Sequence, residues 1–286
     1  MDVEPTILIV GGGSRVGTSL ARRLGARALS IVRGEAREVG QIAVKDYREI
    51  PPRLFTGIDR VVNCVGITGG STALMQQINI DMPLALTMRA RDQGVAQLIH
   101  ISSFSVYGRS PEICRETPAV PSGAYGRSKL EADTALAALT APGFSVTVLR
   151  LPLVYAEHDM GKLGSLMRAW LKTRTFPIPR QDVRRSMIGV ELTADVIAGL
   201  LDRAPYSGVV FAADPTPFSY RAAAAASAER LYCLPLPRLA TRLARGLAPG
   251  LGDRLFCDSA LRSTDNLAEA FHLPSRLYSD IAGIQP

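Results

Sequence analysis

The chain of 286 residues is 47% hydrophobic and 21% charged, the composition of a globular protein that can bury a sizeable core. Its net charge of +7 comes from arginines spread along the chain and not from a basic block with interleaved aromatic residues, which argues against nucleic acid as a partner. The 4 cysteines and 3 histidines are scattered without the spacing of a zinc site, so we expect no metal.

Short apolar runs alternate with segments of helical periodicity from the N-terminus onward. Such runs suit strands buried on both faces, and the alternation predicts a doubly wound α/β sheet with right-handed connections. No run approaches the roughly 18 residues of a membrane span, and the N-terminus is acidic, so we expect a cytoplasmic protein without stable membrane insertion. The expected strands are 7–10, 29–32, 60–65, 98–101, 146–151 and 209–211, and the expected helices are 16–24, 73–93, 124–139 and 163–172.

A glycine-rich turn follows the first expected strand. Gly11, Gly12 and Gly13 are followed by Ser14, Arg15 and Val16, and helical periodicity begins around Gly17. Glycines let the backbone approach a pyrophosphate, which then lies at the amide-rich N-terminus of the helix. The turn therefore predicts a dinucleotide site.

The end of the second expected strand indicates which dinucleotide binds. An acidic side chain at this place would hydrogen-bond the ribose 2′-hydroxyl of NAD. This chain has Arg33 there, with Arg15 in the glycine-rich turn, and a guanidinium can pair with the 2′-phosphate of NADP in bidentate fashion. Because Glu35 lies nearby, NAD(H) stays the alternative, and we expect NADP(H) to be favoured over NAD(H).

Tyr125 and Lys129 form a Tyr-x-x-x-Lys pair on the expected helix 124–139. Residues four apart on a helix share one face, so the two side chains can reach the same small volume. A phenol has a pKa of about 10, and an ammonium beside it brings the proton transfer closer to neutral pH. Upstream, the strand 98–101 leads into the hydroxyl cluster Ser102, Ser103 and Ser105. These features predict an enzyme that moves a proton beside a dinucleotide.

The composition changes after Tyr155, where prolines separate shorter elements, with helices expected at 222–232 and 238–247. We expect a dinucleotide-binding domain over 1–155 and a mainly C-terminal substrate-binding lobe over 156–286, with return segments such as 187–212 contributing to the sheet. In the last expected helix, Leu239, Leu243 and Leu247 recur at helical spacing between arginines. We expect these leucines to pack on their neighbours in the lobe, and the alternative is a basic amphipathic helix on an anionic membrane surface.

Together these motifs resemble the extended short-chain dehydrogenase/reductase family, in the branch of nucleotide-sugar epimerases, dehydratases and 4-keto-reductases. The resemblance implies a Rossmann-type doubly wound parallel sheet with a smaller C-terminal substrate lobe. The family's glycine motif maps onto Gly11, Ser14 and Gly17, with Ser14 in place of the middle glycine. It also implies Asp46 near the adenine and a fourth strand that passes the pyrophosphate. The expected cofactor contacts are Gly11, Gly13, Ser14, Arg15, Val16, Gly17, Arg33, Asp46, Cys64, Val65, Gly66, Tyr125 and Lys129.

The same resemblance implies the catalytic roles. Ser103, four residues before Tyr107 in a Val-Tyr-Gly sequence, would hydrogen-bond the substrate oxygen, and Asn79 would support the active site. Tyr125 would donate or accept the hydroxyl proton of the substrate. Lys129 would lower the pKa of Tyr125 and bind the nicotinamide ribose. Arg185 resembles the arginine that grips a nucleotide diphosphate, so the expected substrate contacts are Ser103, Tyr125 and Arg185.

The reaction expected from these residues is the NADPH-dependent reduction of a nucleotide-activated keto-sugar, because Arg33 points to NADPH, an exchangeable reductant. One departure weakens the likeness to epimerases: the Asn that many of them place before Val-Tyr-Gly is Leu153 here. The alternatives are a nucleotide-sugar 4-epimerase similar to UDP-glucose 4-epimerase, a reductase of another ketone class, such as a flavonoid-like or steroid-like one, and a non-catalytic dinucleotide-binding scaffold subunit.

The family resemblance also implies a homodimer. The helices expected at 73–93 and 124–139 are those that the family commonly pairs across a two-fold axis. Apolar contacts would come from Leu84, Met88, Leu136 and Leu139, with burial against the sheet as the competing interpretation.

Overall fold

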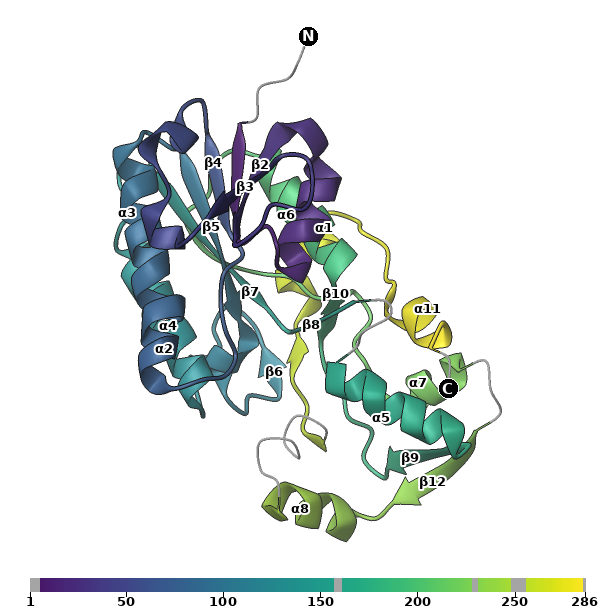
Figure 1. Cartoon of the computed structure of the whole chain (residues 1–286). Helices are drawn as coiled ribbons and strands as arrows, with labels where there is room; N and C mark the ends of the chain where they lie inside the picture. Colours follow the sequence, from purple (N-terminus) through teal and green to yellow (C-terminus); the bar gives the residue numbers. More distant parts are fainter. Residues whose placement is uncertain (1–5, 157–160, 228–230, 248–255, 285–286) are drawn as a thin grey trace. The chain divides into compact units, whose positions relative to one another are not determined.

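A computed structural model describes residues 6–156, 161–227, 231–247 and 256–284 (Figure 1). The chain forms two compact units, both discontinuous in sequence. The first unit comprises Met1–Gly108, Pro118–Leu151 and Thr193–Ala212, and the second comprises Arg109–Thr117, Pro152–Leu192 and Ala213–Pro286.

The first unit is built on a seven-stranded parallel sheet in the order β11-β7-β5-β4-β1-β2-β3. Strand order reverses at β1, which pairs with β2 on one side and with β4 on the other. A reversal of this kind opens a crevice outside the carboxyl ends of the strands, where α/β proteins bind ligands. The doubly wound fold is thus confirmed. The strands are β1 (Ile7–Val10), β2 (Ala28–Arg33), β3 (Gln41–Val44), β4 (Arg60–Asn63), β5 (Gln97–Ser103), β7 (Ser145–Leu151) and β11 (Gly208–Phe211).

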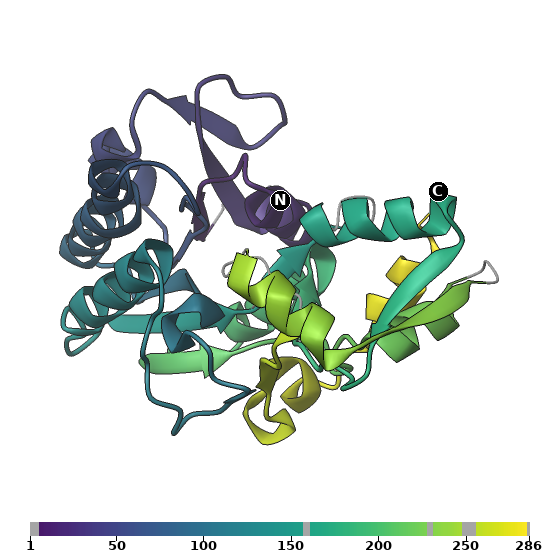
Figure 2. The same ribbon diagram turned by 90° about the horizontal axis from the view of Figure 1, so that it is seen from below.

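Helices cover both faces of this sheet (Figure 1). On one face α1 (Arg15–Leu24) and α6 (Val190–Leu201) lie together, and Arg23 Nε donates to Asp195 Oδ1 over 2.8 Å. On the other face α3 (Met82–Asp92) lies beside α4 (Ala124–Ala137), as Figures 1 and 2 both show. Apolar side chains between these layers form the core, for example Leu8, Val61 and Leu98, all fully buried.

The segment expected as one helix over 73–93 contains a π-helical turn. It consists of α2 (Thr72–Gln76), the π turn η4 (Gln77–Asp81) and α3. Single π turns within helices occur often at functional sites, and this one carries Asn79. The remaining short helical turns of the first unit are η1 (Gly25–Arg27), η2 (Tyr47–Glu49), η3 (Pro52–Phe55) and η5 (Phe104–Tyr107).

The second unit combines three two-stranded parallel sheets with short helices. Its core is aromatic, with Tyr155, Phe176, Phe218 and Tyr220 buried together. The paired strands are β8 (Leu153–Tyr155) with β10 (Met187–Gly189), β9 (Thr175–Pro179) with β12 (Tyr232–Leu236), and β6 (Glu112–Ile113) with β13 (Ala260–Leu261). The helices are α5 (Gly161–Lys172), α7 (Tyr220–Ala226), α8 (Arg238–Leu247), the 3₁₀ turn η6 (Ser263–Asp265), α10 (Leu267–Ala270) and α11 (Leu277–Ala282).

Two expectations for the second unit are wrong. The helix expected over 222–232 ends at Ala226, and Tyr232 instead begins β12, which pairs with β9. The helix at 238–247 forms, but Leu239 and Leu243 are 67% and 57% exposed and are not packed on neighbours of the lobe. The side chain of Leu247 lies outside the described residues.

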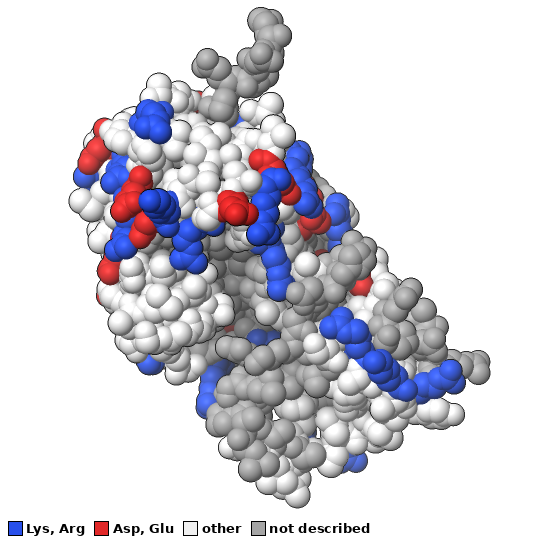
Figure 3. Space-filling model, viewed as in Figure 1, with Lys and Arg blue, Asp and Glu red and all other residues white. Residues whose placement is uncertain are grey.

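Charged side chains of both signs are interspersed over the face of the first unit that Figure 3 shows. A surface of this kind differs from the continuous basic stripe of a nucleic-acid-binding domain. Across the described ranges, no helix is both long and apolar enough to cross a membrane.

The homodimer remains a prediction, and the structure changes the residues that would form it. Leu136 is fully buried in the core and cannot contact a partner, whereas Met88 on α3 is 43% exposed and Leu84 is half-buried. We expect light scattering at micromolar concentration to report a dimer, and Met88→Glu to weaken it because the substitution places a charge at an apolar interface. The control is Leu153→Glu, at an exposed site of the second unit. A wild-type monomer would contradict the prediction.

Candidate functional site

The glycine-rich turn connects β1 to α1 at the carboxyl edge of the sheet. Ser14 is the N-cap of α1, and its hydroxyl accepts a hydrogen bond from Gly17 N over 3.0 Å. Serine is a favoured N-cap residue, so the replacement of the family's middle glycine by Ser14 secures the start of the helix. The helix N-terminus, with its partial positive charge, thus faces the crevice.

Two glycines of this turn allow close backbone contacts. A Cβ on Gly17 would lie 2.3 Å from Gly11 O, which no side chain can occupy. Gly11 has φ +89°, and a Cβ there would lie 2.8 Å from Val65 Cγ2 and 3.0 Å from the carbonyl carbon of Cys64. The turn therefore packs directly on the segment after β4, as a pyrophosphate-binding turn requires.

A cavity of about 630 Å³ lies at this edge of the first unit. It brings together the glycine-rich turn, the end of β2 and the segment after β4, three parts expected from the sequence to hold a dinucleotide. A cavity of this size and lining fits such a cofactor. The lining residues are Gly11, Gly13, Ser14, Thr18, Val32, Arg33, Glu35, Arg37, Glu38, Gln41, Tyr47, Cys64, Val65, Gly66, Ile67, Leu74 and Ile78.

Not every expected cofactor residue lines this cavity. Asp46 does not, because its carboxylate caps the η2 turn and pairs with Arg48, and these bonds lower its pKa to about 2. The neighbouring Tyr47 lines the cavity instead, and its hydroxyl accepts a hydrogen bond from Arg33 N over 3.2 Å. Arg15, Val16 and Gly17 belong to α1 and are likewise outside the lining set, as are Tyr125 and Lys129 of α4.

Arg33 lies at the end of β2, exposed and on the cavity. Within the described part of the chain, no carboxylate forms an ion pair with its guanidinium. Glu38, which also lines the cavity, pairs with Arg22 over 3.4 Å. Arg33 is therefore available to a phosphate at this end of the cavity.

Cys64 lines the same cavity, and its thiol is unreactive. Burial raises the pKa of its thiol to about 12. A thiol with such a pKa stays protonated at physiological pH, and it is the thiolate that reacts. Cys64 therefore forms part of the cavity wall and does not act as a nucleophile.

The N-terminal turn of α4 packs closely on the hydroxyl cluster after β5. A Cβ on Gly126 would lie 2.3 Å from Ser105 O, so glycine next to Tyr125 is required for this approach. Ser103 ends β5, where its Oγ accepts from Ser105 N over 3.1 Å and donates to Ser105 Oγ over 3.1 Å. Tyr125 is half-buried at the start of α4.

Lys129 is deeply buried, with 2% of its surface exposed. Its Nζ donates to Ile101 O over 2.6 Å and lies 3.0 Å from His100 Nε2. Burial lowers the pKa of Lys129 to about 8, while the nearby Asp133 carboxylate opposes this shift. A Cβ on Gly66, which lines the cavity, would lie 4.0 Å from Lys129 Nζ. Lys129 thus lies directly beneath the cofactor cavity.

Asn79 joins the segment after β4 to helix α4. Its Oδ1 accepts from Ile67 N over 2.9 Å, and its Nδ2 donates to Ile67 O and to Ser128 Oγ, each over 3.0 Å. Ser128 Oγ in turn donates to the carbonyl oxygen of Tyr125 over 2.9 Å. Asn79 therefore holds the Tyr125 backbone and the cavity wall in one hydrogen-bonded arrangement.

A buried ion pair secures the next turn of α4. Asp133 Oδ2 accepts from Arg150 Nε over 2.9 Å and from Ser102 Oγ over 2.9 Å. Arg150 Nη1 donates to the hydroxyl of Tyr107 over 2.7 Å. Through Asp133, Arg150 near the end of β7 is thus linked to both α4 and β5.

Arg185, the expected diphosphate-binding residue, lies in the second unit. Its Nη1 donates to the carbonyl oxygen of Cys257 over 2.8 Å, and its backbone bridges Phe218 and Ser259. Arg185 is thus held by segments far apart in sequence, an arrangement that local sequence patterns do not reveal.

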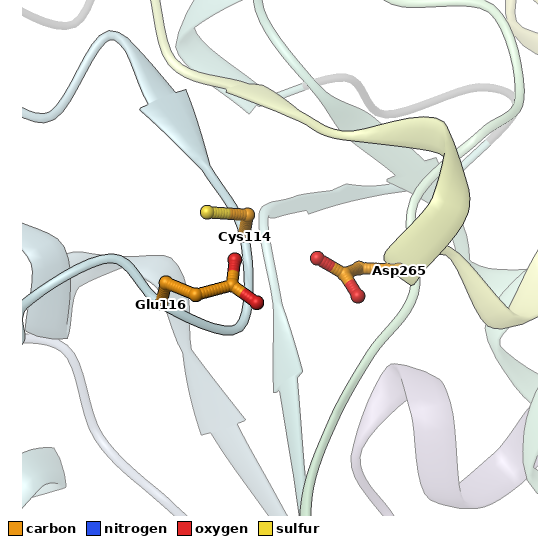
Figure 4. Close-up of side chains that lie close together, drawn as sticks. All are labelled: Cys114, Glu116 and Asp265. Atoms are coloured by element: carbon orange, nitrogen blue, oxygen red, sulfur yellow. The ribbon is translucent and has the colours of Figure 1, made fainter.

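One cluster in the second unit has the residue types of metal ligands. Cys114 and Glu116 come from one loop and Asp265 faces them from η6, with their ligand atoms within 4.8 Å of one another (Figure 4). These atoms have partners within the protein. Asp265 Oδ2 accepts from Arg115 N, Arg262 pairs with Glu116, and Cys114 Sγ contacts Thr117 Oγ1 over 3.2 Å. The cluster attaches the loop after β6 to the segment after β13.

Comparisons with known proteins agree with this geometry. The sequence profile of the NAD dependent epimerase/dehydratase family matches residues 7–201. A 4-hydroxy-2-methyl-3-oxo-4-farnesyl-3,4-dihydroquinoline-1-oxide ketoreductase of Stigmatella aurantiaca is 24% identical over 234 residues, which are 74% of this chain and 69% of the relative.

Two solved structures share the fold at low sequence identity. The UDP-glucuronic acid 4-epimerase from Bacillus cereus in complex with NAD has a TM-score of 0.72 at 15% identity, over 98% of this chain and 96% of that one. RMD from Pseudomonas aeruginosa complexed with NADPH has a TM-score of 0.66 at 18% identity, over 97% of this chain and 98% of that one.

Proposed function

The chain belongs to the NAD dependent epimerase/dehydratase family and is therefore an enzyme with a nicotinamide dinucleotide cofactor, and we propose that it is an NADPH-dependent reductase of a nucleotide-activated keto-sugar. The observation that carries the choice of NADPH is Arg33, exposed on the cofactor cavity and in no ion pair with a described carboxylate. NADPH exchanges after each turnover, whereas an epimerase retains its cofactor, so a preference for NADPH supports net reduction.

In the proposed reaction, the bound nicotinamide supplies the hydride and the chain's own residues manage the substrate oxygen. Tyr125 donates its hydroxyl proton to that oxygen. Ser103 Oγ is held in place by Ser105 N, and its hydroxyl hydrogen turns from Ser105 Oγ to the substrate oxygen. Asn79 keeps the Tyr125 backbone in position through Ser128. Arg185 of the second unit would bind the diphosphate of the substrate.

The ketoreductase name of the Stigmatella aurantiaca relative supports reduction as the reaction class. It also favours a second candidate, a reductase of a ketone in a ring fused to an aromatic ring, because the name of that relative describes a farnesylated 3-oxo-dihydroquinoline oxide. A 4-epimerase remains a third candidate, and it is favoured by Glu35 and Glu38, two acidic residues on the cavity of the kind that bind NAD.

A thermal-shift panel of nucleotide sugars and aromatic ketones, each with NAD or NADP, separates these candidates, because ligands that bind the folded form raise its apparent stability. Turnover assays with the ligands it identifies then follow. We expect NADPH to be consumed with a nucleotide keto-sugar. Interconversion of two sugars without net use of cofactor would establish the epimerase, and consumption only with aromatic ketones would establish the second candidate.

The preference for NADP(H) is tested at Arg33. We expect Arg33→Ala to weaken NADPH binding about ten- to a hundredfold and to leave NADH binding nearly unchanged, because a charge-assisted hydrogen bond contributes about 1.5–3 kcal/mol. Calorimetry with both cofactors measures the effect. The matched control is Arg53→Ala, an exposed arginine of the same unit that does not line the cavity. Equal losses for both cofactors would refute the assignment of Arg33.

A further inference from the structure

The segment from β12 to α8 leaves its large apolar side chains exposed. Tyr232 and Leu234 on β12 are 74% and 52% exposed. Leu239 and Leu243 on α8 are also more than half exposed. Single exposed apolar residues are ordinary on a protein surface, whereas several in one short segment indicate a surface that contacts something apolar.

The core of the second unit does not extend to these side chains. It is built around aromatic residues such as Phe176 and Tyr220, and among the described residues none of the four exposed side chains belongs to it or packs against it. Figure 1 shows α8 at the lower end of the second unit, apart from α5, α7 and α11. The apolar side chains of α8 are therefore not part of the core around which the unit folds.

Apolar and basic residues form separate stripes along α8. Leu239 and Leu243 are four residues apart, and so are Arg238 and Arg242, so each pair lies along one line of the helix. All four side chains are exposed. A helix of this kind can place its leucines in an apolar phase while its guanidinium groups stay in water, because the arginine side chain is long enough to reach past the boundary.

The charge of the segment is of one sign. Residues 231–247 contain three arginines and no acidic residue. Within the described ranges, no carboxylate forms an ion pair with Arg238 or Arg242. The negative surface potential of an anionic bilayer attracts arginines near it. Positive charge beside exposed leucines is thus complementary to anionic headgroups that lie over acyl chains.

A second copy of the chain fits this surface less well. A two-fold interface places the same patch of both copies face to face, so the arginines of one α8 would meet those of the other, and like charges brought together are unfavourable. Strand pairing through β12 is also interrupted, because Pro235 lacks the backbone N–H that a neighbouring strand would need. Both features favour a lipid surface as the partner.

We propose that α8 docks the chain on the surface of an anionic membrane. Leu239 and Leu243 enter the boundary between headgroups and acyl chains, and Arg238 and Arg242 remain at the level of the lipid phosphates. The helix has 10 residues, so it lies along the surface and does not cross the bilayer. Because one short helix buries little apolar area, the binding is reversible and requires anionic lipid.

Co-sedimentation of the full chain with lipid vesicles tests the proposal. One set of vesicles is pure phosphatidylcholine, and the other contains about one-third phosphatidylglycerol, which supplies negative charge. We expect the chain to pellet with the anionic vesicles at about 0.1 M salt and to stay in the supernatant with the neutral ones. Salt at about 1 M should release it, because the Debye length falls from about 10 Å to about 3 Å.

The variant Leu239→Gln separates entry of α8 into the lipid from a general attraction of a basic chain to anionic vesicles. It keeps the net charge of +7 but removes an exposed apolar side chain. We expect the binding constant to fall about tenfold or more, the effect of burying one leucine side chain. The control is Leu153→Gln, which changes a leucine of similar exposure in the same unit and should bind like the wild type.

A second pair of variants tests where the charge acts. Arg242→Gln and Arg53→Gln lower the net charge equally, but Arg242 lies on α8 and Arg53 is an exposed arginine of the first unit. We expect Arg242→Gln to weaken binding about fivefold, the effect of one arginine close to an anionic surface. Arg53→Gln should have little effect.

Three results would overturn the proposal: no binding to anionic vesicles, equal binding to neutral and anionic vesicles, or equal losses for the α8 variants and their controls. Light scattering without vesicles adds a fourth, since a dimer that Leu239→Gln dissociates would assign this surface to a second copy of the chain. All variants change exposed side chains, so circular dichroism should show the wild-type fold. No reaction enters these assays, so their failure would leave the reductase proposal intact.

Discussion

Replacement of Tyr125 by Phe is expected to lower turnover by about 10²–10⁴-fold or more, because it removes the hydroxyl that exchanges a proton with the substrate oxygen. The fold should be kept, since Tyr125 is only half-buried and Phe preserves its ring. Turnover is measured with the ketone and cofactor that the ligand panel identifies. Cofactor affinity, measured by calorimetry, should stay within about twofold of the wild-type value. The substitution removes an interaction of the chemical step and not one that binds the cofactor.

Two further variants make the result specific. Tyr206→Phe removes a phenol hydroxyl from an exposed residue of the same unit and should leave turnover unchanged. Ser103→Ala should lower turnover less than Tyr125→Phe, because Ser103 orients the substrate oxygen without supplying its proton. Full activity of Tyr125→Phe would mean that the proton donor lies elsewhere.

Much of the first unit could be predicted because its signals are local. β1 spans Ile7–Val10, as expected, since a short apolar run between a polar N-terminus and glycines is typical of a buried strand. β3 (Gln41–Val44) was not among the expected strands, because this edge strand is short and no residue of it is fully buried. The π turn around Asn79 was also missed, since the apolar periodicity continues across it.

The second unit was harder to predict because its elements are paired over long distances. Tyr232 follows an alanine-rich helix in the sequence and was assigned to it, but β9 lies more than 50 residues upstream and supplies the hydrogen bonds that make a strand of 232–236. The prediction that the leucines of α8 pack on their neighbours was wrong for a related reason. Periodicity identifies the apolar face of a helix but not the element that covers it.

At the candidate site, the sequence indicated the residues that we propose to act on ligands, but not the residues that hold those side chains in place. Tyr125 and Lys129 stand out through their spacing, and Arg33 through its place after a strand. His100, one of 3 scattered histidines, has no local signal, and its contact with Lys129 joins residues 29 positions apart. Gly126 could have been noticed, since a glycine inside a helix costs stability and usually has a packing reason.

Asp133→Ala is expected to lower the free energy of unfolding by about 3–5 kcal/mol, the cost of leaving a buried charge without its partner. Arg150 is 8% exposed and would keep only its bond to the Tyr107 hydroxyl, while Ser102 would lose its acceptor. Burial raises the pKa of Asp133, and the charge of Arg150 opposes this shift. The ionised form of Asp133 therefore depends on Arg150, just as buried Arg150 depends on Asp133. Urea unfolding followed by circular dichroism measures the change.

The controls separate a buried pair from an exposed one. Arg262→Ala removes ion pairs to Glu112 and Glu116, whose side chains are 62% and 72% exposed, and should cost no more than about 1 kcal/mol. The double variant Asp133→Leu and Arg150→Met should regain much of the stability lost in Asp133→Ala, because removal of both charges of a buried pair is often nearly neutral. A single variant as stable as the wild type would contradict the prediction.

The same variants connect stability to the site. Asp133 lies one turn after Lys129 on α4, and its bonds to Ser102 and Arg150 fix this helix to β5 and β7. The double variant would restore packing without restoring these bonds, and a misplacement of about 1 Å at the reacting groups can cost about 10²-fold in rate. We therefore expect it to recover stability more completely than turnover, which would show that the buried pair serves the position of Tyr125 and Lys129.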